Sequence, residues 1–180
     1  MKVLFTCLTF LFTLNVFSQT IVVVKDADLG ADTVSWTKDN VYHLDGYVIL
    51  ESGGLLNIEA GTVIKGLATP STGDISSALI IARGAKINAR GTADQPIIFT
   101  AEFDDVTDPS DLTKNDRGLW GGVLILGSGI VGVNTGLFNV EGIPSTEGRA
   151  EYGGTNNDDN SGVLKYVSIR HGGSKLEANN

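Results

Sequence analysis

Short apolar segments separated by glycine corners recur between residues 46 and 100 of this chain. The segments occupy residues 46–54, 55–62, 63–66, 77–84, 85–92 and 96–100. No stretch of helix length separates them, and strands this short cannot bury a hydrophobic face alone. The pattern therefore predicts a solenoid, in which each coil buries its apolar side chains by stacking on its neighbours.

Alternation within these segments predicts which side chains point into the coil, because successive residues of a strand face opposite sides. The predicted inward residues are Val48, Leu50, Leu56, Ile58, Val63, Leu79, Ile81, Ala85, Ile87, Ile97 and Phe99. Without the polar stretch at residues 67–76, the spacing leaves roughly 20 residues per coil, which fits three short strands and three corners.

Polar or glycine-rich inserts interrupt the coils at residues 67–76, 102–117 and 134–162. Both of the first two contain a proline, and the second contains five aspartates, which is typical of surface loops. Residues 19–45 are predicted to form an N-terminal strand and cap region, and residues 46–180 the coils with their inserts. The 23 glycines and the aromatic content of 7% favour tight turns and thin strands over a thick helical core.

The first 18 residues predict export. Lys2 precedes an apolar run that closes at Ser18, as in a secretory signal peptide, and this run is too short for a membrane span. Cys7, the single cysteine, lies inside this segment, so the exported chain has no disulfide. A net charge of −8 without basic runs makes nucleic acid and anionic membranes poor partners.

Longer motifs extend the pattern beyond Thr100. They occupy residues 84–100, 120–127, 140–144, 152–154 and 159–173. With them, residues 41 to 177 resemble a family of secreted, largely uncharacterised right-handed parallel β-helix proteins of Bacteroidota-type bacteria. The resemblance implies an all-β fold, namely a right-handed parallel β-helix. It also implies that the protein is secreted from a Gram-negative cell or lies on the cell surface. Members of the family run on into further coils, so we expect these N-terminal coils to be incomplete, with an open end that meets further coils or a second copy.

A G-x-G-x-x-G pattern at residues 127–132 resembles a dinucleotide-binding turn. That chemistry requires a helix to begin at the glycines, so that its N-terminus faces the pyrophosphate. The following residues, 133–140, are β-branched and broken by glycine. We therefore interpret the glycines as coil corners and predict no organic cofactor.

Calcium is the one cofactor for which the sequence offers ligands. Carboxylate and amide oxygens are the donors that calcium prefers, and they gather in Asn156, Asp158, Asp159 and Asn160. The same residue types also form Asx turns. The aspartates of residues 102–117 raise the same possibility less strongly.

Trp120, Tyr166 and Arg170 are the predicted ligand-binding residues. Exposed aromatic rings offer flat apolar faces to sugars, and alternation along the last strand places Arg170 outward, on the side of Ser168. Packing is the alternative role for Trp120, because the adjacent Gly121 and Gly122 would let its ring lie across a neighbouring coil.

No catalytic set is visible in the sequence: the carboxylates are scattered, and the two histidines, His43 and His171, are far apart. We therefore predict a non-catalytic exported module for surface display or carbohydrate adhesion, with glycans or cell-surface components as partners. Two alternatives remain. One is the N-terminal part of a polysaccharide lyase or glycoside hydrolase whose active site lies downstream, and the other is a structural spacer.

Overall fold

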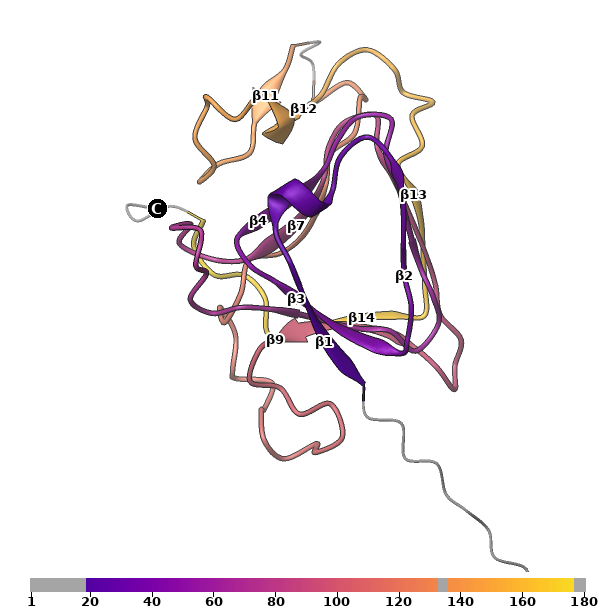
Figure 1. The fold of residues 1–180 in the computed structure, drawn as a ribbon. Helices are drawn as coiled ribbons and strands as arrows, with labels where there is room; N and C mark the ends of the chain where they lie inside the picture. Colours follow the sequence, from indigo (N-terminus) through magenta and orange to yellow (C-terminus); the bar gives the residue numbers. More distant parts are fainter. Residues whose placement is uncertain (1–18, 133–135, 177–180) are drawn as a thin grey trace, which may run out of the picture.

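The computed structural model describes residues 19–132 and 136–176. In this part of the chain it contains strands and two short 3-10 turns, with no α-helix. The chain winds through three sheets that form the sides of a triangle (Figure 1). The predicted signal peptide at residues 1–18 lies outside the described residues. No helix within the described ranges is long and apolar enough to cross a membrane.

Each sheet collects one strand from successive coils, paired in parallel. The first sheet contains β1 (Thr20–Val24), β3 (Asn40–Leu44), β6 (Val63–Gly66), β9 (Ile97–Ala101) and β14 (Val167–Ile169). The second contains β4 (Tyr47–Leu50), β7 (Ala78–Ile81) and β10 (Gly122–Ile125). The third contains β2 (Thr33–Trp36), β5 (Leu55–Ile58), β8 (Lys86–Arg90) and β13 (Gly162–Lys165). This arrangement is the right-handed parallel β-helix that the sequence predicts, and parallel crossovers are almost always right-handed.

Register pairs give the length of each coil. Thr20 lies beside Asn40, and Val41 lies beside Val63, so the first coils are close to the predicted length. Later coils are longer because the inserts interrupt them: Ile98 lies beside Ser168. Residues 19–45 contribute β1, β2 and β3 to these sheets, and the 3-10 turn η1 (Asp26–Asp28) lies beside β4, where the first coil has no strand of the second sheet.

The main hydrophobic core fills the triangle. Every predicted inward residue except Val63 belongs to it, and Ile64 takes the inward place instead, in register with Phe99. The Gly61–Thr62 corner ends one residue later than alternation predicts. The side chains of β6 that were expected to point inward therefore point outward, and the others point inward. Val63 points outward but is only 7% exposed, because it lies between Val41 and Ile98 of the neighbouring strands.

A second apolar layer covers the outer side of the second sheet. Its buried members are Ile49, Ala78, Ile80, Ala82, Leu126, Ile143 and Ala150. The last two come from the described part of the insert at residues 134–162. This part packs over the sheet and contains the β11 (Phe138–Asn139) and β12 (Glu151–Tyr152) hairpin and the turn η2 (Gly148–Ala150). The β4 and β7 strands of the second sheet are therefore buried on both sides.

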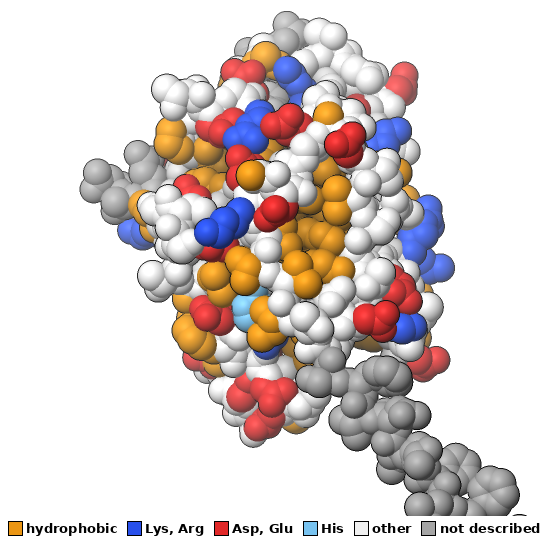
Figure 2. Space-filling model, in the orientation of Figure 1, with side chains coloured by type: hydrophobic (Ala, Val, Ile, Leu, Met, Phe, Trp, Pro, Cys, Tyr) orange, Lys and Arg blue, Asp and Glu red, His pale blue; other side chains and the backbone are white. Residues whose placement is uncertain are grey.

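The two ends of the stack leave apolar side chains exposed. In the view of Figures 1 and 2 the N-terminal coil faces the reader, and hydrophobic side chains gather near the middle of this face. At the other end, Leu164 and Ile169 occupy inward register positions but are 42% and 49% exposed. Within the described residues no further coil lies over them.

Candidate functional site

A cleft lies outside the second sheet, between the insert at residues 67–76 and the described part of the insert at residues 134–162. We call it the insert cleft. Its volume is about 560 Å³, a size typical of small-molecule sites. Its apolar lining includes Ile49, Ile75, Ile143 and Pro144, and its charged lining is Asp26, Asp74, Glu147 and Arg149.

Arg149 ties the longer insert to the first coils. Its guanidinium meets Asp26 at 2.9 Å, Glu51 at 3.2 Å and Glu147 at 2.6 Å. Asp26 belongs to η1, and Glu51 follows β4, so one side chain joins three separate segments. Hydrogen bonds from Arg149 lower the pKa of the Glu147 carboxyl, and the same bonds raise the pKa of the guanidinium.

Asp45 fixes the insert at residues 67–76, which forms the other wall of the insert cleft. Its buried carboxylate accepts hydrogen bonds from the Ser71 amide and, at 2.6 Å, from the Ser71 hydroxyl, and Lys25 lies 3.3 Å away. Burial alone would raise the pKa of Asp45, but the Ser71 hydrogen bonds and Lys25 outweigh it and lower the pKa. Within the same wall, Asp74 accepts a hydrogen bond from the Tyr47 amide at 3.0 Å.

We expect acid to loosen both walls of the insert cleft. The pKa values of Asp45 and Glu147 are lowered in the fold, so their contribution to stability is full above the ordinary carboxyl range, about pH 4, and is lost as the pH falls through their folded values. Thermal melts from about pH 6 to pH 3 measure this loss. Because the Glu147→Gln variant has one linked carboxyl fewer, its stability should fall less steeply below pH 4, and an unchanged slope would contradict the assignment.

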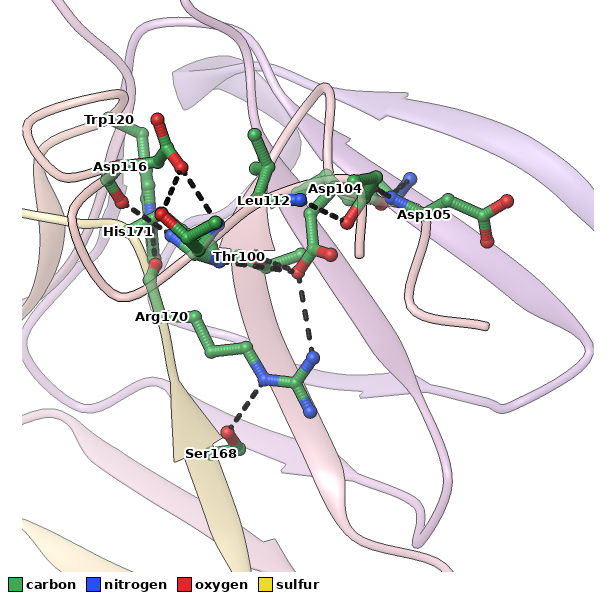
Figure 3. Close-up of polar contacts among 12 residues, drawn as sticks. Thr100, Asp104, Asp105, Leu112, Asp116, Trp120, Ser168, Arg170 and His171 are labelled. Carbon is green, nitrogen blue, oxygen red and sulfur yellow. Dashed lines mark hydrogen bonds and ion pairs between the residues drawn. The ribbon is translucent and has the colours of Figure 1, made fainter. Parts of the chain in front are cut away.

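A second, polar hollow of about 470 Å³ lies where the insert at residues 102–117 meets the end of β14. The buried Asp104 carboxylate belongs to its lining and accepts a hydrogen bond from Thr100 (Figure 3). Arg170 approaches this carboxylate to 3.7 Å, and His171 to 4.0 Å. We call this group the Asp104 cluster.

The insert at residues 102–117 uses its other aspartates to hold its own shape. Asp105 accepts hydrogen bonds from Thr107, Asp108 from Ser110 and Asp116 from Thr113. These bonds lower the pKa of each of the three carboxyls. Such Asx motifs order the loop locally.

The comparison with protein families matches residues 29–180 to a model described as a pectate-lyase-like β-helix domain. The chain belongs to this family. The match confirms the parallel β-helix family that the sequence motifs indicated and associates the domain with carbohydrate-related β-helix modules. No curated protein and no solved structure matches the chain significantly.

Trp120 of this pectate-lyase-like domain does not have the sugar-stacking role predicted for it. The side chain is fully buried in the main core, and its indole nitrogen donates to the Arg170 carbonyl at 2.7 Å. The packing alternative describes it correctly, but the glycine that makes room is Gly66 on the neighbouring coil: a Cβ there would lie 2.7 Å from the indole ring.

Tyr166 and Arg170 lie near opposite ends of β14, roughly 13 Å apart for four extended residues. Tyr166 is 54% exposed, and Lys165 lies 5.6 Å from its ring centre. Arg170 faces the side of Ser168, as alternation predicts, and donates to the Ser168 hydroxyl at 3.0 Å. The structure therefore does not gather the three predicted ligand residues into one site.

The predicted calcium ligands make hydrogen bonds with the backbone. Asp159 accepts from the Ser128 amide at 2.9 Å, Asn156 from the Asp158 amide and Asn160 from the Gly162 amide. Asp158 is exposed. Among the described residues no group of three or more His, Cys, Asp or Glu side chains is arranged to hold a metal ion. Calcium binding by the amide and carboxylate oxygens of this loop stays a prediction.

The residues of the insert cleft were missed by sequence reasoning. Asp26, Glu51 and Arg149 are far apart in the chain, and no motif links them. One signal was present: β4 and β7 are continuous apolar runs, and strands that are buried on both sides have this pattern. The runs could have shown that something covers the second sheet, although not which segment.

Proposed function

We propose that this pectate-lyase-like domain is an exported, non-catalytic module that binds carbohydrate in the insert cleft. The observation that carries the proposal is the composition of the cleft, where apolar side chains such as Ile75 and Pro144 lie beside carboxylates. Sugars present the same two kinds of surface, apolar C–H faces and hydroxyl groups, and mixed linings of this kind orient small polar ligands.

The electrostatics of Glu147 favour binding over hydrolysis. A general acid for glycoside cleavage needs a raised carboxyl pKa, so that it holds a proton near neutral pH. Arg149 has the opposite effect on Glu147, because its hydrogen bonds lower the pKa of that carboxyl. Glu147 is suited to accept hydrogen bonds from a ligand, and it is poorly suited to donate a proton.

Export to the surface of a Gram-negative cell belongs to the same proposal and is supported by the leader-like residues 1–18. Soluble glycans or cell-surface components are the proposed partners. The exposed inward side chains Leu164 and Ile169 support a further contact at that end, with additional coils or a second copy of the domain. Sedimentation as a monomer at high concentration would count against the second copy.

A glycan array probed with and without a chelator tests the proposal. We expect binding to a subset of glycans, reduced at least tenfold by Thr146→Trp, because Thr146 is an exposed residue of the cleft lining and a bulky ring there occupies the cleft. Thr155→Trp, exposed in the same insert but outside the lining, is the matched control. Unchanged binding in Thr146→Trp would show that the cleft is not the binding site. Loss of binding when chelator is added would support the calcium prediction.

Catalysis on a polysaccharide is the second candidate, favoured by the Asp104 cluster. His171 adopts a left-handed backbone conformation, with φ of 57°, which is uncommon outside glycine and recurs at functional sites. Release of shortened chains from polysaccharides, lost in His171→Ala, would favour this candidate. Absence of both binding and cleavage would favour a structural spacer.

A further inference from the structure

We propose that the insert cleft selects neutral or aminated sugars and discriminates against uronates, an inference that rests on the carbohydrate binding proposed above. The starting observation is charge. Among the residues that the structure describes, three carboxylates, those of Asp26, Asp74 and Glu147, line the cleft together with one guanidinium, that of Arg149. Glu51 adds a fourth carboxylate behind that guanidinium.

Arg149 has no donor left for an acidic ligand. A guanidinium carries five N–H groups. Here Nε donates to Glu147, one terminal nitrogen donates to Asp26 and Glu51, and the other donates to Asp26 and Glu147. Five hydrogen bonds therefore occupy five donors. A uronate carboxylate could gain the bidentate pair that usually recognises it only by breaking these bonds.

The carboxylates, in contrast, keep capacity to accept. The Tyr47 amide and the Thr72 hydroxyl both donate to Oδ2 of Asp74, and no described group donates to its Oδ1. Asp74 comes from one insert and Glu147 from the other, so both inserts contribute acceptors to the lining of the cleft. Sugar hydroxyls and ammonium groups can donate to such oxygens, whereas a uronate carboxylate has no hydrogen to donate and is repelled by them.

Three oligosaccharide series with one backbone test the inference: cello-oligosaccharides, which are neutral, chitosan oligosaccharides, which are aminated, and cellouronates. Calorimetry at about pH 5.5 keeps the amines protonated, and a chelator prevents bridging of uronates by divalent cations. We expect the aminated series to bind at least about tenfold more tightly than the uronates at low salt, with a smaller ratio at high salt. The neutral series should lie between them.

Asp74→Asn is the matched variant. It keeps an acceptor oxygen for the Tyr47 amide but removes one negative charge, so the ratio between aminated and uronate affinities should fall by a factor of about three to ten. Asp94→Asn, an exposed carboxylate outside the cleft lining, should leave that ratio unchanged.

The possible outcomes separate the two proposals. Uronate binding as tight as aminated binding, blocked by Thr146→Trp, would overturn the charge selection and leave carbohydrate binding in the cleft intact. An unchanged ratio in Asp74→Asn would also overturn the selection. If none of the three series bound and the glycan array were negative as well, carbohydrate binding itself would be wrong, and the selection with it.

Discussion

Trp120→Ala is expected to lower the free energy of unfolding by about 3–5 kcal/mol, the usual cost of removing a large aromatic side chain from a core. The ring is fully buried and packs against the backbone of β6 at Gly66. The substitution also removes the indole hydrogen bond to the Arg170 carbonyl, at the end of β14. Chemical denaturation with matched m-values measures the loss.

The contact between Trp120 and Gly66 can be isolated by a double-mutant cycle. Gly66→Ala should cost about 1–3 kcal/mol through overcrowding, because the new methyl group would lie within 3.0 Å of three atoms of Trp120. In the double variant that methyl group enters the space left by the ring. The double variant should therefore lose less stability than the sum of the losses in the two single variants. Gly30→Ala, with no atom within 4 Å of the added carbon, is the control and should change stability little. Strict additivity would contradict the proposed contact.

Gly162→Ala should detach the last described coil. A Cβ on Gly162 would clash with the Ile87 carbonyl oxygen, and the residue has a φ of 123° that other residues rarely adopt. Crowding and backbone strain together should cost about 2–4 kcal/mol, and since the clash is with backbone, β13 must move away from β8. Hydrogen exchange of β13 and β14 should accelerate more than that of β5 and β6.

Gly148→Ala provides the matched control for this prediction. Gly148 belongs to the same insert, has no left-handed conformation, and has no atom within 4 Å of the position a Cβ would take. Its substitution should leave the exchange of β13 and β14 unchanged. Equal protection of these strands in the Gly162 and Gly148 variants would show that the close approach to Ile87 is relieved at little cost.

Strand alternation predicted about half of the buried main core, because each strand places every second side chain inward, and all but one of the residues it placed inward belong to that core. It was wrong at Val63 because the facing of a strand depends on where the preceding corner ends, and the sequence does not show whether a corner has one residue more or less. Ile64 and Val63 are both apolar, so composition could not correct the register.

Trp120 and the insert cleft show a different limit. Aromatic residues serve equally well in cores and in binding sites, and only the absence of a side chain at Gly66 explains why the core can accept this ring. The cleft depends on contacts between residues that are far apart in the sequence. Arg149 contacts Glu51, 98 positions away, and Asp26, 123 positions away. Such contacts arise from how an insert folds back, which local patterns do not encode.

The unequal coil lengths have a consequence for the order of folding. Pairing Val41 with Val63 closes a short loop, whereas pairing Ile98 with Ser168 closes one of roughly 70 residues. The free-energy cost of the entropy lost on closure is greater for the longer loop by about 1 kcal/mol. Early contacts favour the shortest closures. The N-terminal coils should therefore fold first, and later strands should then pair with them in sequence. The coil of β13 and β14 should fold last.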